Sequence, residues 1–348
     1  MLSARRHCYL LNTVLNPRVG TLQRESKSLV EVPSRSITYS ATGIPQGNWT
    51  EMAERIVQTI RTIPQLRAEI AARRRTGASV GFVPTMGALH AGHCALIERA
   101  ASEHDVVVVS IFVNPAQFNE PSDLHQYPRD EQRDFAAAAS AGATICFAPS
   151  VEEISPQGFS TKVHVSGPLT ETLEGAERGA EHFDGVATVV TILLNIVSPQ
   201  TAYFGAKDAQ QALVVERFVS DLQIPVKIVT AGTVRDDDGL ALSSRNERLT
   251  AAGREQALAL SAALQVVASS ISDGSASNPA QAIDAGHKRL RAAGVTAEYF
   301  AITDPTTLKP AEQLSGELLI ACAARVEGVR LIDNLTVIAN REASTANC

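Results

Sequence analysis

Residues 80–93 read VGFVPTMGALHAGH, and this stretch decides the fold. It begins as a short apolar run typical of a buried strand, turns at Thr-Met-Gly, and continues into a predicted helix. In open α/β sheets, a strand that leads into a helix through a glycine turn presents the helix N-terminus to phosphate groups. His90 and His93 stand at this turn, where imidazole N–H groups can donate to phosphate oxygens. A histidine at a helix start is also common as a cap, so the motif indicates phosphate chemistry only together with further polar clusters.

Strand and helix patterns alternate along the chain, which is typical of a doubly wound parallel sheet. The run DVVVVSIFVN at residues 105–114 is nearly continuous in apolar residues, as expected for a strand covered on both faces. The other strands are expected at Ser79–Pro84, Ala143–Phe147, Ser160–Ser166, Ala202–Phe204 and Pro225–Val234, and helices at Thr50–Thr76, Gly92–Glu103, Asp130–Ala141, Asp184–Val197 and Asp208–Asp221. The fold class is therefore α/β, with a Rossmann-like sheet.

The pattern changes near residues 235–240, where we place a domain boundary. An Ala-rich helix at Ala251–Ser270, a linker rich in Gly, Ser and Asn, a further helix and alternating strands from Val295 onward follow. A chain of 348 residues is long enough for two domains. We therefore predict a nucleotide-binding α/β domain over residues 50–237 and a smaller α+β domain over residues 238–340.

Residues 1–49 are predicted to be an N-terminal extension outside this fold. They contain six basic and two acidic residues, are rich in Ser and Arg, and lack a long apolar core. This composition resembles a mitochondrial transit peptide more than a secretory signal, although a non-targeting extension fits it nearly as well. We therefore expect a mitochondrial or a cytoplasmic location, with a slight preference for the mitochondrion.

Composition and charge argue against several classes of protein. The net charge of −6 argues against a general nucleic-acid binder. The longest apolar stretch, Val186–Val197, is too short to span a bilayer and predicts a buried helix, so no membrane partner is expected. The five cysteines are scattered and form no Cys-x-x-Cys pair, which argues against a disulfide framework or a structural zinc, and we predict no metal-ligating side chains.

Polar clusters follow four of the expected strands at their carboxyl ends, where doubly wound sheets bind ligands. The first is the turn with the two histidines, and the others are residues 114–118, 205–211 and 234–246. Lys207, in the third cluster, is one of only six lysines against twenty-five arginines and precedes a predicted helix. Its ammonium group there can stabilise charge in a phosphoryl-transfer transition state, whereas a solvated surface lysine is the ordinary alternative. The neighbouring Asp208 is either a helix cap or a group near the ribose or a metal ion, and the cap explains it at least equally well.

The fourth cluster contains Ser243, Ser244 and Arg245. Two hydroxyls and a guanidinium group suit triphosphate oxygens, although a serine-capped turn fits this tripeptide alone about as well. Gln117 and Gln211 can each donate and accept hydrogen bonds, so they suit a substrate with both hydroxyl and carboxylate groups. Together the clusters predict chemistry on a nucleotide phosphate and a substrate with hydroxyl and carboxylate groups.

The motifs PTMGALHAGH (84–93), FVNPAQF (112–118), YPRD (127–130), HFDGVATVV (182–190), FGAKDAQQ (204–211) and DGLALSSRN (238–246) resemble, in order and spacing, those of the pantoate–β-alanine ligase (pantothenate synthetase) family. The resemblance covers roughly residues 60–338, and the His-x-Gly-His motif alone is shared with the wider HIGH-motif nucleotidyltransferase superfamily. It implies a two-step reaction in which pantoate and ATP give pantoyl adenylate and diphosphate, and β-alanine then displaces AMP to give pantothenate. It also implies Mg²⁺ for the leaving diphosphate and a homodimer through the nucleotide-binding domain.

The resemblance also implies roles for individual residues. Gln117 and Gln211 would hold pantoate, and His93, His90, Lys207, Ser243 and Arg245 would carry the catalytic contacts. The ATP site would comprise Met86, Gly87, Ala88, Leu89, His90, Ala91, Gly92, His93, Gly205, Ala206, Lys207, Asp208, Val234, Leu242, Ser243, Ser244 and Arg245. An adenylate must be protected from water, so we expect the smaller domain to act as a lid.

The chain departs from the family pattern at two places. Ala206 stands where the family usually has Glu, and the segment between Leu173 and His182 is one residue longer than usual, which affects where Arg178 points. An alternative function is that of a nucleotidyltransferase that stops at a nucleotide adduct of another small substrate. Such an enzyme would share the two histidines but would have no need for Gln117 and Gln211. A nucleotide-sensing module without turnover is disfavoured because the set of His, Lys, Ser and Arg side chains is complete.

Overall fold

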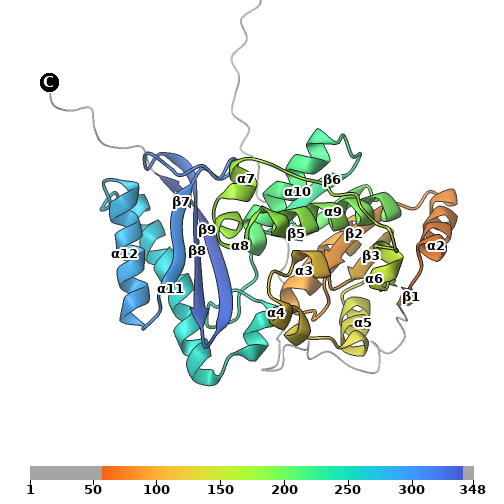
Figure 1. Cartoon of the computed structure of the whole chain (residues 1–348), viewed down its shortest axis with the longest axis horizontal. Helices are drawn as coiled ribbons and strands as arrows, with labels where there is room; N and C mark the ends of the chain where they lie inside the picture. The colour runs from red at the N-terminus through yellow and green to blue at the C-terminus, as the bar shows by residue number, and fades with distance from the viewer. Residues whose placement is uncertain (1–56, 340–348) are drawn as a thin grey trace, which may run out of the picture. The chain divides into compact units, whose positions relative to one another are not determined.

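The computed structural model describes residues 57–339, and Figure 1 shows the arrangement of its helices and strands. Six parallel strands form one sheet in the order β1-β4-β3-β2-β5-β6. Their bounds are β1 Gln58–Ile60, β2 Val80–Thr85, β3 Val106–Ile111, β4 Ile145–Phe147, β5 Thr201–Gly205 and β6 Lys227–Ala231. The expected α/β class with a doubly wound parallel sheet is confirmed.

Helices cover both faces of this sheet. The longer ones are α2 Ile63–Arg75, α3 Ala91–Glu103, α5 Glu131–Ser140, α9 Ala180–Val197 and α10 Ala209–Asp221. The shorter ones are α4 Pro121–Gln126, α6 Val151–Ile154, α7 Pro168–Glu171, α8 Glu174–Arg178, and the 3₁₀ turns η1 Pro115–Gln117, η2 Ala206–Asp208 and η3 Ser244–Arg248. The valines of β3 explain why both faces are covered, because Val106 and Val108 pack into the core with α2, α9 and α10. Val107 and Val109 point the other way, into a second core with α3 and α5.

Helix α9 is the apolar centre of the larger core. By length and composition alone this helix could cross a membrane, but 67% of it is buried inside the fold, as is usual for the core helix of a globular protein. It begins four residues earlier than expected, and the prediction of a buried helix is confirmed. At Gly185 a side chain would meet the carbonyl oxygen of Ala116 at 2.3 Å. The helix therefore packs directly on η1, which ends at Gln117.

The C-terminal part consists of α11 Ala251–Ser272 and α12 Pro279–Ala292, followed by β7 Ala297–Thr303, β8 Gly316–Val326 and β9 Val329–Ala339. The three strands form an antiparallel sheet in the order β7-β8-β9, and Figure 1 shows it beside α11 and α12. Leu260 and Leu264 of α11 pack with Phe300 and Ile320 of the sheet in a separate core. This is the α+β arrangement expected after residue 238, while the domain bounds themselves stay a prediction.

One expected helix is shorter than predicted, and one expected strand is wrong. Within Thr50–Thr76, Gln58–Ile60 is the edge strand β1, paired with β4, and the helix begins only at Ile63 with a proline in its first turn. Residues 50–56 lie outside the described part. Ser160–Ser166 forms no strand. The apolar residues alternate in this segment because Val163 and Val165 pack on the core. The backbone N–H of Val163 donates to Thr188 Oγ1 of α9, at 2.9 Å, and not to a neighbouring strand.

The strand expected at Pro225–Val234 is shorter, because its partner β5 ends at Gly205, opposite Ala231.

Candidate active site

A cavity of about 460 Å³ lies at the carboxyl ends of the parallel strands, with β8 and β9 contributing to its wall. This is the edge at which ligands bind in doubly wound sheets. Of the residues expected to bind ATP, those in its lining are Met86, His90, Gly92, His93, Gly205, Lys207, Asp208, Val234, Leu242, Ser243, Ser244 and Arg245, and Gln117 and Gln211 join them. Five expected residues lie outside the lining: Gly87, Ala88, Leu89, Ala91 and Ala206.

The two histidines cap helix α3 reciprocally. His90 Nδ1 accepts from the backbone N–H of Gly92 at 3.2 Å, and His93 Nδ1 accepts from the backbone N–H of His90 at 3.3 Å. Because a backbone N–H can only donate, Nδ1 of both rings is unprotonated, and in the neutral ring the proton is on Nε2. The ring centroids are 4.1 Å apart. The sequence left capping and phosphate contact open as alternatives, and the structure shows the cap.

Both histidines are neutral at pH 7. The pKa of His93 falls to about 4, mainly because the ring is buried. The charge of Asp208 raises this pKa and the charge of Lys207 lowers it, both by smaller amounts. Burial also holds the pKa of His90 well below 6.5, and the positive charges of a protonated His93 and of Lys207 lower it further. A neutral imidazole with its proton on Nε2 donates one hydrogen bond to an oxygen without adding a permanent charge.

The turn before His90 is held by a buried carboxylate that the sequence analysis missed. Asp134 of α5 accepts from the backbone N–H of Ala88 at 2.9 Å and of Leu89 at 2.7 Å. Ala88 has a φ of 49°, in the left-handed region that L-residues rarely adopt. At Gly87, with a φ of 83°, a Cβ atom would lie 2.8 Å from Asp134 Oδ2. These backbone N–H groups are therefore used inside the protein and do not face the cavity.

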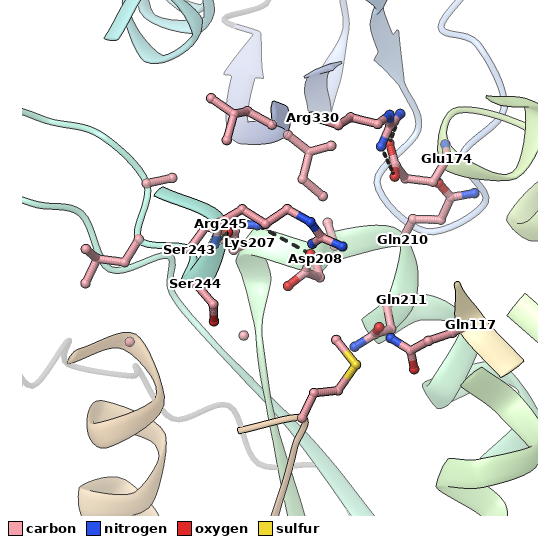
Figure 2. Close-up of a pocket in the computed structure, with 18 of the residues that line it drawn as sticks. Gln117, Glu174, Lys207, Asp208, Gln210, Gln211, Ser243, Ser244, Arg245 and Arg330 are labelled. Atoms are coloured by element: carbon pink, nitrogen blue, oxygen red, sulfur yellow. Dashed lines mark hydrogen bonds and ion pairs between the residues drawn. The ribbon is translucent and has the colours of Figure 1, made fainter. Parts of the chain in front are cut away.

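Lys207 and Asp208 form a close pair on the cavity wall. Lys207 Nζ lies 3.5 Å from Asp208 Oδ1, and Figure 2 shows this pair as a dashed line. The lysine side chain is 17% exposed, so it is not the solvated surface lysine that the sequence left possible. Asp208 directly precedes α10, but its carboxylate makes no capping hydrogen bond, so the interpretation of this side chain as a cap is wrong.

The Ser-Ser-Arg loop contacts both the histidine turn and α4. Ser244 Oγ donates to the carbonyl oxygen of Ala88 at 3.0 Å, which joins this loop to the turn held by Asp134. Arg245 donates to Asp123 Oδ2 at 2.8 Å, and Arg248 donates to Asp123 Oδ1 at 3.0 Å. Burial tends to raise the pKa of Asp123, but the two guanidinium groups outweigh it and the pKa falls below its usual value.

The wall around Gln117 is also preorganised. Asn114 Nδ2 donates to Gln117 Oε1 at 3.1 Å, and His182 Nδ1 donates to the Gln117 carbonyl oxygen at 2.7 Å. Arg178 lines the cavity, and its guanidinium group lies 3.4 Å from His182 Nε2. Burial lowers the pKa of His182 to about 4, so this ring is neutral as well. Gln211 lines the same cavity, and Figure 2 shows its side chain near Gln117.

The C-terminal sheet supplies charged groups that the sequence analysis did not single out. Arg330 donates to both oxygens of Glu174, at 2.6 and 2.9 Å, and Tyr299 Oη donates to the same carboxylate at 2.9 Å. Figure 2 shows the Arg330–Glu174 pair beside the cavity. These residues are 125 to 156 positions apart in the sequence, and no local pattern marks such a contact.

Comparisons with known proteins decide the family. The family model described as pantoate-beta-alanine ligase matches residues 58–336. The chain belongs to the pantoate–β-alanine ligase family. A pantothenate synthetase of Cereibacter sphaeroides is 49% identical over 278 residues, which is 80% of this chain and 99% of that protein. Another, of Moorella thermoacetica, is 48% identical over 285 residues, 82% of this chain and all of that protein.

Solved structures of relatives agree with this assignment. The pantothenate synthetase of Thermus thermophilus is 48% identical and superposes with a TM-score of 0.76, covering 81% of this ligase and 100% of that chain. The Francisella tularensis enzyme, solved with beta-gamma ATP and beta-alanine, is 35% identical with a TM-score of 0.68, and the match covers 80% and 97% of the two chains. The resemblance inferred from the six motifs is confirmed.

Replacing Asp134 by Asn should weaken the ligase at the histidine turn. An amide has only one acceptor oxygen for the two backbone N–H groups, and its NH₂ group would face the second donor. We expect the free energy of unfolding, measured by urea denaturation, to fall by about 1–3 kcal/mol. Asp130→Asn is the matched control, because this exposed aspartate, which caps the same helix, only accepts from the backbone N–H of Arg133. Equal losses in both variants would contradict the role given to Asp134.

The neutral histidines predict a pH dependence of stability. Between pH 6.5 and about pH 4 the unfolded chain protonates His93 while the folded chain does not, so stability falls as the pH falls. In His93→Gln, the slope of unfolding free energy against pH should correspond to about one proton fewer in this range. Denaturant unfolding at pH 5.0–6.5 measures it, with the exposed His125→Gln as control. An unchanged slope in His93→Gln would show that the ring is protonated in the folded ligase.

Proposed function

We propose that this ligase makes pantothenate from pantoate and β-alanine in two steps through pantoyl adenylate, of which the first consumes ATP. The observation that carries the proposal is that two kinds of group face a single cavity. His90, His93, Lys207 and Arg245 suit phosphate oxygens, and the Gln117–Gln211 region suits a small hydroxy acid. The relative from Francisella tularensis, solved with beta-gamma ATP and beta-alanine, supports ATP and β-alanine as substrates.

The chemistry explains why an adenylate is needed. A carboxylate cannot lose an oxygen as oxide. In the first step an oxygen of the pantoate carboxylate therefore attacks the α-phosphorus of ATP, and the bond between this phosphorus and diphosphate breaks. The amine of β-alanine then attacks the acyl carbon, the bond to AMP breaks, and the ammonium group loses a proton on the way to the amide. The site must therefore stabilise negative charge on phosphorus in the first step.

Side chains from three segments of the cavity wall are the proposed phosphate contacts. In the proposed first step, His90 and His93 donate through Nε2–H, and Lys207 contributes a positive charge that is largely shielded from water. Ser243 and Arg245 complete the set from the loop after β6. Arg245 is paired with Asp123, so the nucleotide shares this guanidinium group with the carboxylate or displaces it.

The site fits magnesium that arrives with the nucleotide. In residues 57–339 no group of three or more His, Cys, Asp or Glu side chains is placed to hold a metal ion by itself. Mg²⁺ bound to a nucleotide usually needs only one or two protein carboxylates besides the phosphates, and Asp208 beside Lys207 is such a carboxylate. When bound, the ion would neutralise charge on the leaving diphosphate.

We further propose that the C-terminal part closes over the cavity as a lid, since the adenylate must be kept from water. The contacts of Arg330 and Tyr299 with Glu174 would hold the closed position. A homodimer through the nucleotide-binding α/β domain is proposed from the family resemblance alone. Residues 1–56 lie outside the described part, and the composition of residues 1–49 supports a mitochondrial or a cytoplasmic location.

Pyrophosphate exchange tests the two-step reaction. Purified protein with ATP and labelled diphosphate should return label to ATP only when pantoate is present, because the first step is then reversible without β-alanine. Exchange without pantoate would contradict the proposal, as would pantothenate formation without any exchange. Exchange with pantoate that yields no pantothenate after β-alanine is added would favour a nucleotidyltransferase that stops at the adduct.

Lys207→Ala should lower the rate of exchange by about 10²–10³-fold, because it removes the cation proposed to stabilise charge in adenylation. The fold should be retained, because this side chain lies on the wall of the cavity and outside the hydrophobic cores. Thermal unfolding within a few degrees of the unaltered ligase would verify this. Lys227→Ala on β6 is the control, since this lysine is exposed and outside the cavity lining. Equal exchange rates in the two variants would exclude Lys207 from the first step.

A further inference from the structure

Asn334 of β9 makes an unusual pair of contacts with the segment that contains Lys207. Its Nδ2 donates to the carbonyl oxygen of Ala206 at 2.9 Å and to the carbonyl oxygen of Lys207 at 2.8 Å. One side-chain amide thus holds two consecutive peptide groups of η2, including that of the lysine itself. The two contacts join residues 127 and 128 positions apart, from the C-terminal sheet to the parallel-sheet part of the chain.

The asparagine is itself held in place by its neighbour Asp333. Asp333 accepts from Arg235 through both oxygens, at 2.7 and 2.9 Å, and its side chain is only 3% exposed. Asp333 Oδ1 also accepts from the backbone N–H of Asn334 at 2.8 Å. Arg235 directly follows Val234 of the cavity wall and donates to the carbonyl oxygen of Asn334 at 3.3 Å. A bidentate ion pair with a buried carboxylate therefore fixes the strand segment from which the amide projects.

This arrangement bears on the position of the Lys207 ammonium group. The ammonium group lies 3.5 Å from the carboxylate of Asp208. Because Asp208 belongs to the same 3₁₀ turn, this contact does not anchor the turn to another element. The two hydrogen bonds from Asn334 anchor the turn to β9, a strand outside the parallel sheet. A displacement of about 1 Å in a group that stabilises a transition state can reduce a rate by about 100-fold.

We propose that Asn334 is a positioning residue for the first reaction step, which acts through Lys207 by fixing the backbone of residues 206–207. This inference rests on the proposed function, in which the lysine stabilises charge during adenylation. It assigns to the C-terminal sheet a part in placing a phosphate contact, beyond covering the cavity. Asn334 itself lines the cavity, but the effect proposed for it runs through Lys207 and is lost when the lysine side chain is absent.

A double-mutant cycle tests the inference, with the pantoate-dependent exchange rate as the readout. Asn334→Ala should lower the kcat of exchange by about 10–100-fold and change the KM for pantoate by less than about twofold. Asn334→Asp should lower kcat further, because a carboxylate of the same shape only accepts hydrogen bonds and would face two carbonyl oxygens that also only accept. In a Lys207→Ala background, adding Asn334→Ala should reduce the remaining rate by less than about threefold.

Asn195→Ala is the control, because this asparagine also donates from Nδ2 to a carbonyl oxygen, that of Thr191, but on α9 and outside the cavity lining. It should exchange at the rate of the unaltered ligase. If Asn334→Ala does not fold, Asn334→Ser, which keeps a donor in a smaller side chain, replaces it in the cycle. The inference is overturned if Asn334→Ala leaves kcat unchanged. It is also overturned if Asn334→Ala lowers the rate of the Lys207→Ala variant by as large a factor as it lowers the rate of the unaltered ligase. Absence of exchange in the unaltered ligase would instead count against the proposed function.

Discussion

The site depends on the contact between the Asp134 carboxylate and the two backbone N–H groups of the turn after β2. This contact holds Ala88 in its left-handed conformation, and the carbonyl oxygen of the same residue then accepts from Ser244. The turn leads directly into the cap that His90 and His93 form at the start of α3. A single buried carboxylate therefore connects the end of β2, the histidine pair and the loop that carries Arg245. Its partners lie 45 and 46 residues away in the sequence.

The sequence was sufficient for the features that depend on local pattern. Four consecutive valines covered on both faces predicted a central parallel strand, and polar clusters after four strands predicted one shared edge. What could not be predicted depends on pairing across the chain. Asp134, Asp123 and Asn334 are ordinary polar residues in sequence, and only the fold places them against the turn, Arg245 and Lys207. The strand expected at Ser160–Ser166 is wrong for the same reason, since alternating burial arises wherever an irregular segment lies on a core.

Charged groups around the cavity are mostly paired with one another before any ligand binds. Arg245 and Arg248 share Asp123, Lys207 lies near Asp208, and Arg330 meets Glu174. Buried charges need such partners, because the free energy cost of removing an unpaired charge from water is several kcal/mol. The same pairing fixes the positions of these cationic side chains on the cavity wall. The proposed nucleotide therefore meets cations that are already oriented, although its phosphates must compete with carboxylates for them.

The mutual capping of His90 and His93 has a consequence for metal selectivity. Two imidazole rings 4.1 Å apart would ordinarily offer nitrogen ligands to zinc or copper, which bind neutral imidazole strongly. Here each Nδ1 lone pair is occupied by a backbone N–H group, and each Nε2 carries a proton. To bind either metal through Nε2, a neutral ring must move its proton to Nδ1, which then can no longer accept the capping N–H of α3. The cap therefore adds the loss of two hydrogen bonds, of about 1 kcal/mol each, to the free-energy cost of binding a transition metal through this pair.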